Sequence, residues 1–319
     1  MPQFRKHFSI FIKTVITFGL LAFLIYKIHW RELLVTIQEV RPGYLLLSSI
    51  MVLIGEGIIA IRLKVLLDPT IFYLPVLRLL KIGFVAWFYA FFLPAGLGLG
   101  IARWFLITGN KQGRFEFALV TLVEKSLFFG VCLLSIVIPL MILADAQTVA
   151  LRGLLIPVFV VSAICLTLLY AFALWPRANS LAGKWIMAAK EQMGNRMHFL
   201  DEILPKSGLY LCRFDLIGKA GFFTLLVQAA ILARIITLFY SVGVSLPMIT
   251  ALWISSLVFV IQALPISLAG IGVRESAFAY AFGLYGLSPE SGVAVGVLFF
   301  GQMVLCALIG GSVRLARNG

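Results

Sequence analysis

The chain has 319 residues, of which 62% are hydrophobic and 12% are charged. One water-soluble core of this length cannot bury so much apolar surface, so the composition excludes a soluble globular protein and indicates an integral membrane protein. The formal net charge is +13, but the basic residues lie between and beside apolar runs. Membrane topology explains that excess, and no nucleic-acid partner is predicted.

Apolar runs of about 20 residues match helices that cross a hydrocarbon core roughly 30 Å thick, and the alternation of barrel strands is absent. The predicted fold is therefore an all-α polytopic bundle, one transmembrane domain over residues 1–319. About six full spans are predicted: Phe8–Tyr26, Tyr44–Leu66, Phe117–Leu143, Leu154–Trp175, Ala220–Val242 and Gly292–Gly311. The first is too long for the apolar core of a signal peptide and has no small-x-small cleavage site.

Two connecting segments are amphipathic. Residues 27–41 carry Trp30, Leu33 and Ile37 at helical spacing, which predicts a short interfacial helix. Residues 177–219 hold seven Lys/Arg mixed with apolar side chains, which predicts a cytoplasmic segment along an anionic leaflet. A solvated linker is the alternative.

Six spans place both termini on one side of the membrane, and basic residues gather on that side. The positive-inside rule makes it the cytoplasmic side of a plasma or inner membrane. The residues concerned are Arg5, Lys6, Arg62, Lys64, Arg78, Lys81, Lys111, Arg114, Arg314 and Arg317.

Two further apolar regions, Leu79–Leu106 and Met248–Leu287, are interrupted by proline and glycine. The first is entered and left on the cytoplasmic side, and the second on the outer side. This predicts two re-entrant hairpins of opposite orientation, as inverted repeats produce, with tips near mid-membrane. Two kinked spans are the alternative topology.

The interruptions resemble distant copies of each other: Leu93-Pro-Ala-Gly-Leu-Gly-Leu-Gly-Ile-Ala-Arg103 and Leu264-Pro-Ile-Ser-Leu-Ala-Gly-Ile-Gly-Val-Arg274. Proline removes a backbone donor and disfavours helix at the residue before it, while glycine lets the backbone approach closely. We therefore predict helix breaks at Pro94 and Pro265, and a binding backbone at Gly98, Gly100, Gly270 and Gly272.

A new half-helix after each break would present unpaired N–H groups and the positive end of its dipole, with Arg103 or Arg274 nearby. This predicts a phosphate cradle inside the membrane. Helix-packing glycines and a proline kink are the alternative. No strand flanks the first motif, so it is not a dinucleotide-binding fingerprint.

Charged residues within apolar runs cost at least ~2.5–3.5 kcal/mol each on insertion scales, so each needs a partner or water. Six such groups predict a hydrated polar cavity: Glu56, Glu124, Lys125, Arg234, Arg274 and Glu275. For each of them a structural ion pair is the alternative to substrate contact, and for Glu124 and Lys125 that alternative is a mutual pair. Arg62 and Lys64 are interpreted as anchors that snorkel to the interface.

Signals for catalysis are weak. The four cysteines have no metal-ligand spacing, and the sequence lacks a Gly-x-x-x-x-Gly-Lys-Ser/Thr loop and a His-Glu-x-x-His motif. We predict no metal, no cofactor, no ATP hydrolysis and no enzymatic activity.

The segment Leu264-Pro-Ile-Ser-Leu-Ala-Gly-Ile-Gly-Val-Arg-Glu275 resembles the signature of the lysylphosphatidylglycerol synthase transmembrane-region family, a flippase-like domain. The likeness extends over nearly the whole chain. The segment ending at Arg103 is similar to the family's first Pro-Gly motif, and Glu124-Lys125 stands where the family usually has Glu-Arg. Relatives commonly carry Gly-Gly-Asp where this chain has Gly98-Leu99-Gly100, so an acidic partner is missing.

The resemblance implies movement of lipids with charged headgroups, anionic or aminoacylated, between leaflets. Arg103 and Arg274 would hold the phosphate, and Glu56, Glu124 and Glu275 would offset those charges or meet an amine. A homo-oligomer and a separate lipid-modifying enzyme are compatible partners, because we do not expect this chain to carry the soluble transferase domain that accompanies some members of the family. The alternatives are an ion-coupled transporter of a small polar solute, or a glycosyltransferase, for which only Asp145 stands in the relevant external loop.

Overall fold

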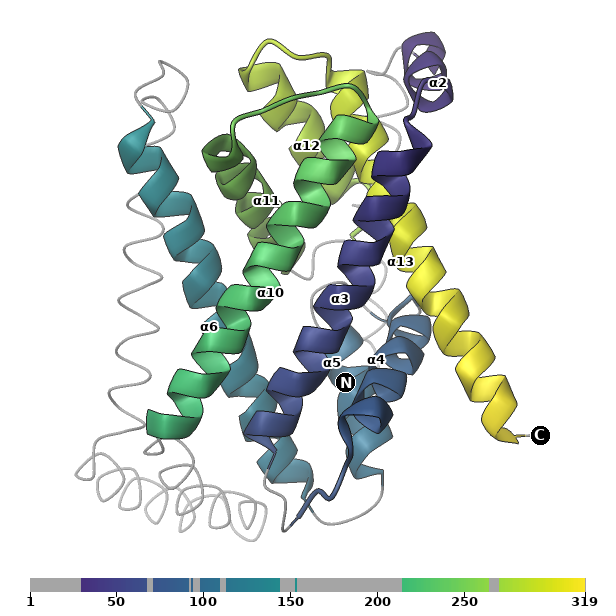
Figure 1. The fold of residues 1–319 in the computed structure, drawn as a ribbon, viewed down its shortest axis with the longest axis vertical. Helices are drawn as coiled ribbons and strands as arrows, with labels where there is room; N and C mark the ends of the chain where they lie inside the picture. Colours follow the sequence, from purple (N-terminus) through teal and green to yellow (C-terminus); the bar gives the residue numbers. More distant parts are fainter. Residues whose placement is uncertain are drawn as a thin grey trace, which may run out of the picture.

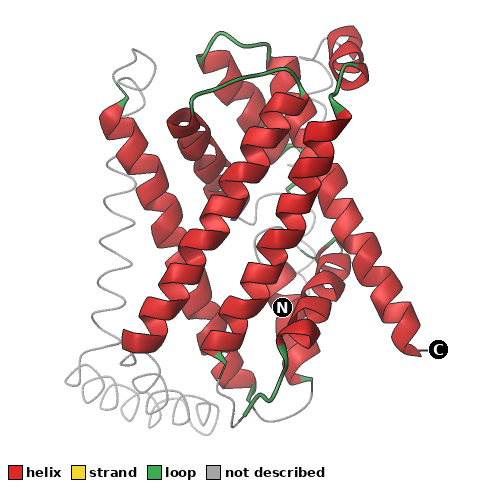
Figure 2. Cartoon of the chain, viewed as in Figure 1, coloured by secondary structure: helices red, strands yellow, loops and turns green. Residues whose placement is uncertain are grey.

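The computed structural model describes residues 30–67, 71–91, 93, 98–109, 113–143, 153, 214–263 and 270–318. Within these residues all regular structure is helical (Figure 2). The helices are α2 (Trp30–Gln38), α3 (Pro42–Leu66), α4 (Val76–Ala90), α5 (Gly98–Thr108), α6 (Arg114–Ile142), α10 (Phe214–Ser241), α11 (Met248–Ala263), α12 (Val273–Leu284) and α13 (Pro289–Asn318).

Four of these helices, α3, α6, α10 and α13, are long and apolar enough to cross a membrane. They match the predicted spans in the described part of the chain. Large apolar side chains such as Leu46 and Leu53 are exposed on α3, as expected where the solvent is lipid. The chain is therefore a multi-pass membrane protein. The predicted spans at 8–26 and 154–175 lie outside the described residues, as does the 177–219 segment up to Phe214, where α10 begins.

Four shorter helices, α4, α5, α11 and α12, form two packed pairs. α4 packs against α5, and α11 packs against α12. Figure 1 shows α4 and α5 in the half of the molecule where α13 ends, and α11 and α12 in the opposite half. The long helices connect the halves, because α3 packs extensively on α10 while α13 contacts both α4 and α12.

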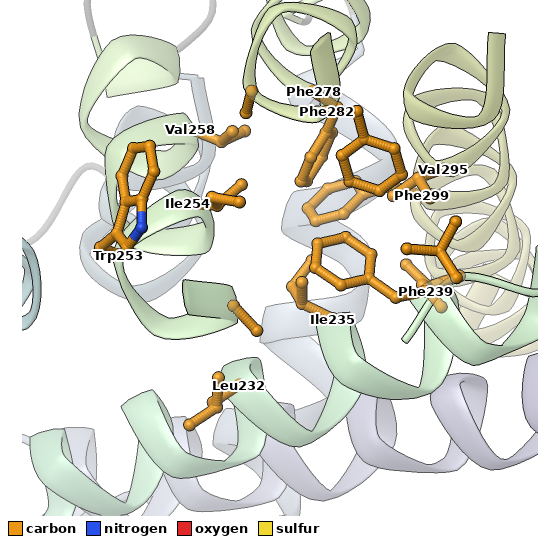
Figure 3. Close-up of a cluster of buried hydrophobic side chains, with 14 of the residues drawn as sticks. Leu232, Ile235, Phe239, Trp253, Ile254, Val258, Phe278, Phe282, Val295 and Phe299 are labelled. Carbon is orange, nitrogen blue, oxygen red and sulfur yellow. The ribbon is translucent and has the colours of Figure 1, made fainter. Parts of the chain in front are cut away.

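An aromatic core joins α10 to α11, α12 and α13 (Figure 3). The ring centroid of Phe239 lies 5.1 Å from that of Phe282 and 6.1 Å from that of Phe278. The fully buried Trp253 donates its indole N–H to the Tyr285 hydroxyl at 3.1 Å. Edge-to-face rings and a satisfied indole stabilise a dense core, which holds the α11–α12 pair rigidly against the long helices.

The helix expected near residues 30–37 is present as α2. Its Leu33 packs on Val293 and Ala294 of α13, whereas Leu34 and Val35 are exposed. α2 therefore covers the beginning of α13 and leaves one apolar face outward. Its interfacial location stays a prediction.

Candidate functional site

A cavity of about 650 Å³, here called the vestibule, lies between α4, α5, α6 and α11. Gly98 and Gly100 line it from the first interrupted region, and Gly270 lines it from the second. The structure thus brings the two regions together at one cavity. Most of the remaining wall is apolar and aromatic: Trp87, Ala90, Phe91, Trp104, Phe128, Phe129, Phe259 and Met303.

The rim of the vestibule is apolar and exposed. Ile101 of α5 and Leu122 of α6 both line the cavity, and their side chains are 36% and 51% exposed. α6 is long and apolar enough to cross a membrane, and α5 is a shorter apolar helix. The vestibule therefore opens sideways between α5 and α6, toward the surroundings of the bundle.

A second cavity of about 200 Å³, here called the chamber, adjoins the vestibule. The two share Trp87, Leu99, Lys125, Phe128, Phe259, Gln262 and Met303. The described chamber walls carry four cationic side chains and two carboxylates: Arg62, Arg103, Lys125, Arg234, Glu56 and Glu124. The vestibule is therefore apolar, and the chamber is charged with an excess of cations.

Three helices meet in the chamber through buried ion pairs. Arg103 Nη2 lies 3.2 Å from Glu56 Oε2, and Arg103 Nη1 lies 3.6 Å from Glu124 Oε1. Arg62 Nη2 lies 2.5 Å from the same Glu124 oxygen. The indole of Trp87 donates to Glu56 Oε1 at 2.8 Å. Each carboxylate thus balances a guanidinium, which lowers the cost of burying both charges.

The interpretation of Arg62 as a snorkelling anchor is wrong. The residue is only 3% exposed, and besides binding Glu124 it donates to Thr224 Oγ1 of α10 at 3.1 Å. Ser48 and Gly55 lie on the same face of α3 as Arg62, and these small residues let α10 pack closely. Arg62 therefore turns inward, between α6 and α10, instead of toward the interface.

Lys125 stands at the junction of the vestibule and the chamber and lines both. The ion pairs of Glu124 are with Arg62 and Arg103, so the alternative of a simple Glu124–Lys125 pair is not what the structure contains. Among the described residues, Lys125 makes no hydrogen bond or ion pair. Its ammonium is thus the chamber cation left open to a ligand.

Arg234 lines the chamber, as expected for one of the six charged groups that predicted a polar cavity, although it was not predicted to bind substrate. Its guanidinium lies 3.6 Å from the ring centroid of Phe299, and its Nε donates to Gln302 Oε1 at 2.7 Å. Gln302 Nε2 donates to Ser48 Oγ at 2.9 Å, and that hydroxyl donates to the Arg234 carbonyl at 3.0 Å. These three hydrogen bonds form a closed set through Arg234, Gln302 and Ser48, which joins α10, α13 and α3. Its only sequence signal is a charge deep in an apolar run.

The second motif is arranged differently from the first. Gly270 and Gly272 have φ of 75° and 83°, a left-handed conformation that suits glycine. Glu275 Oε2 accepts the Gly272 N–H at 2.7 Å, and Glu275 Oε1 lies 2.5 Å from Arg274 Nη2. The helix's own carboxylate therefore caps the beginning of α12.

Arg274 is fully buried, with its guanidinium 4.9 Å from the Phe299 ring centroid. Phe299 lines the chamber, and neither Arg274 nor Glu275 is among the described lining residues. Arg103, in contrast, lines the chamber directly. The roles predicted for these residues in phosphate binding stay predictions. Pro94 and Pro265 lie outside the described residues.

Side chains that could bind a metal ion are scattered. In the described part of the chain, no group of three or more His, Cys, Asp or Glu side chains could hold a metal ion. The predicted absence of metal and cofactor stays a prediction.

A comparison with protein families shows which family this chain matches. The model of the lysylphosphatidylglycerol synthase TM region matches residues 10–311. Comparison with curated proteins and with solved structures gives no match. The family match covers both interrupted regions and every residue of the vestibule and chamber named above. The chain therefore belongs to the lysylphosphatidylglycerol synthase transmembrane-region family, whose members are membrane proteins of lipid metabolism or transport.

Proposed function

We propose that this protein moves phospholipids with charged headgroups from one leaflet to the other, without ATP hydrolysis and without a catalytic step. The observation that carries the proposal is the junction of an apolar, sideways-open vestibule with a charged chamber. A phospholipid needs an apolar environment for its acyl chains and, next to it, a charged environment for its headgroup. Its acyl chains would stay in the vestibule and the adjoining lipid while its headgroup enters the chamber.

The charge of the chamber favours a headgroup with net negative charge. Four cations face two carboxylates on the described walls, and Lys125 is the cation without a described partner. A phosphodiester would offset that excess in a medium of low dielectric constant, where an unmatched charge is costly. An aminoacylated headgroup would add ammonium groups to a chamber that already holds too many cations. We therefore propose an unmodified anionic phospholipid as the preferred substrate.

The short helices support the proposed topology of two opposed re-entrant hairpins. α4, α5, α11 and α12 have 15, 11, 16 and 12 residues, fewer than the roughly 20 that one crossing needs. We propose that α4–α5 enters from the cytoplasm, where both termini lie, and that α11–α12 enters from outside. Cysteines at Tyr73 and Arg114 would then label from one side of the membrane, and cysteines at Ser245 and Ser288 from the other. If the two regions were kinked spans instead, the two cysteines of each pair would label from opposite sides of the membrane.

The main alternative is an ion-coupled transporter of a small polar solute. Such a protein needs a cavity that opens to water and gains nothing from an apolar opening toward lipid. The exposed Ile101 and Leu122 on the vestibule rim favour the lipid substrate.

The test is a transport assay in liposomes with fluorescent phosphatidylglycerol, in which a quencher added outside reports the exchange between leaflets. The wild type should exceed protein-free liposomes. Ala118→Trp, which fills the vestibule at its rim, should bring transport close to that background. Ala229→Trp is the matched control, because Ala229 is exposed on α10 and lines neither cavity. Transport by the wild type no faster than in protein-free liposomes would overturn the proposal.

A further inference from the structure

A third cavity, of about 730 Å³, lies between α4 and the last turns of α13, and we call it the basal groove. Its described lining residues are Arg78, Lys81, Ile82, Val85, Leu106, Val313, Arg314 and Ala316. None of them lines the vestibule or the chamber. The basal groove is thus separate from the proposed transport site.

The shape of the groove follows from the contact between the two helices. A side chain at Gly310 of α13 would overlap the Phe84 backbone of α4, so only glycine permits this contact. Beyond it α13 diverges from α4 toward its C-terminal end (Figure 1). The groove is the wedge that opens between them on that side.

The α4 wall of the groove has a cationic part and an aliphatic part. Arg78, Lys81, Ile82 and Val85 are spaced i, i+3, i+4 and i+7, so they share one face of α4, with the cations in the turn nearer the helix start. On the opposite wall Arg314 follows Val313, and its guanidinium lies 4.8 Å from the Tyr89 ring centroid. Arg78 and Lys81 therefore border a surface that continues as aliphatic side chains, and the Arg314 guanidinium lies farther along α4, at Tyr89.

The three cations lack acidic partners within the described residues. Arg78, Lys81 and Arg314 form no ion pair there, and no carboxylate is among the described lining residues. Arg314 is exposed, and its guanidinium lies over the Tyr89 ring as a cation–π contact. Arg78 and Lys81, one turn apart near the beginning of α4, suit a phosphate, and an acyl chain would continue along the groove beside Ile82, Val85 and Val313.

From these observations we infer that the basal groove binds the phosphate of an anionic phospholipid from the leaflet on the side where α13 ends. The lipid joins α4 to α13, and α4 contributes Trp87 to the vestibule. This site would hold its lipid whether or not the protein transports lipid, so it goes beyond the proposed function.

The experiment is photo-crosslinking in phosphatidylcholine vesicles that contain phosphatidylglycerol with a photoactivatable acyl chain, followed by peptide mass spectrometry. Label is expected on the peptides with Ile82 and Val313. The variant Arg78→Gln/Lys81→Gln/Arg314→Gln should lower that label at least about tenfold, because each cation near a charged lipid is worth about fivefold in affinity. Arg78→Lys/Arg314→Lys should keep most of it.

The matched control removes three cations elsewhere: Arg31→Gln/Lys64→Gln/Lys219→Gln, which should leave the groove label unchanged. The melting temperature of each variant in detergent reports that it is folded, independently of any lipid in the vestibule. Equal labelling of the groove by photoactivatable phosphatidylcholine, or unchanged label in the triple groove variant, would overturn the inference. Displacement of the label by inorganic phosphate would also overturn it, because the ligand would then be a soluble phosphate and not a lipid.

Discussion

Arg62 of α3 and Glu124 of α6 are joined by a 2.5 Å contact between Nη2 and Oε1, although both residues lie within membrane-crossing helices and are almost fully buried. Glu124 also faces Arg103 of α5, so one carboxylate holds cations from two helices. This carboxylate is the point at which α3, α5 and α6 are connected electrostatically.

Glu124→Ala should destabilise the protein by about 3–5 kcal/mol, because it leaves the buried Arg62 guanidinium without its carboxylate. The measurement is thermal unfolding in detergent. Glu39→Ala makes the same chemical change at an exposed position and should be nearly neutral. Equal melting temperatures for the two variants would contradict a structural role for the Glu124 ion pairs.

Lys125→Met should affect transport much more than stability. Lys125 makes no ion pair within the described residues, so its replacement leaves no buried carboxylate unpaired there. The chamber nevertheless loses the cation at its entrance. We expect phosphatidylglycerol transport to fall about tenfold, which corresponds to about 1.4 kcal/mol. Lys219→Met, at an exposed position of α10, is the control for loss of one charge. A Lys125→Met variant that transports like the wild type would remove Lys125 from the site.

The rate of transport should follow the charge of the headgroup. Phosphatidylglycerol should move faster than phosphatidylcholine, and phosphatidylcholine faster than lysyl-phosphatidylglycerol, because the chamber has more cations than carboxylates. The measurement compares fluorescent forms of the three lipids in the same liposomes. In Lys125→Glu the preference for phosphatidylglycerol should shrink or reverse. The opposite order in the wild type would leave transport intact but refute the assignment of the headgroup.

Gly310→Val should weaken the packing of α13 on α4, since a side chain there overlaps the Phe84 backbone. Overpacking of a tight contact typically costs about 1–3 kcal/mol. Gly301→Val is the control, because Gly301 lies on the same helix and a side chain at that position would meet only open space. The comparison separates the loss of packing from the effect of valine on helix propensity. Thermal unfolding should separate the two variants clearly, and similar losses for both would show that the α4–α13 contact adapts.

The helices of the described region follow closely from the sequence because membrane helices are set by local composition. Runs of apolar residues longer than a crossing predicted α3, α6, α10 and α13. These signals lie within one segment of chain. They need no knowledge of which helices become neighbours.

The chamber was only partly predictable for the opposite reason. Glu56, Arg103, Glu124 and Lys125 stand out as charges in apolar runs, and the structure brings them together. Sequence patterns could not place Arg62 inside the bundle, because its direction depends on the α10 side chain that receives it. Nor could they find Gln302, an uncharged residue that matters only through Arg234.

Phe299 lies against two guanidinium groups, that of Arg234 at 3.6 Å and that of Arg274 at 4.9 Å from its ring centroid. Both cations are thus stabilised by aromatic and polar neighbours before any lipid enters. A headgroup phosphate entering the chamber would meet Arg234, which lines that cavity, while the number of charges held within the membrane by the protein would stay constant. The free-energy cost of placing these cations in a bilayer would therefore be met once, when the protein folds, and would not recur with each lipid that the proposed transport moves.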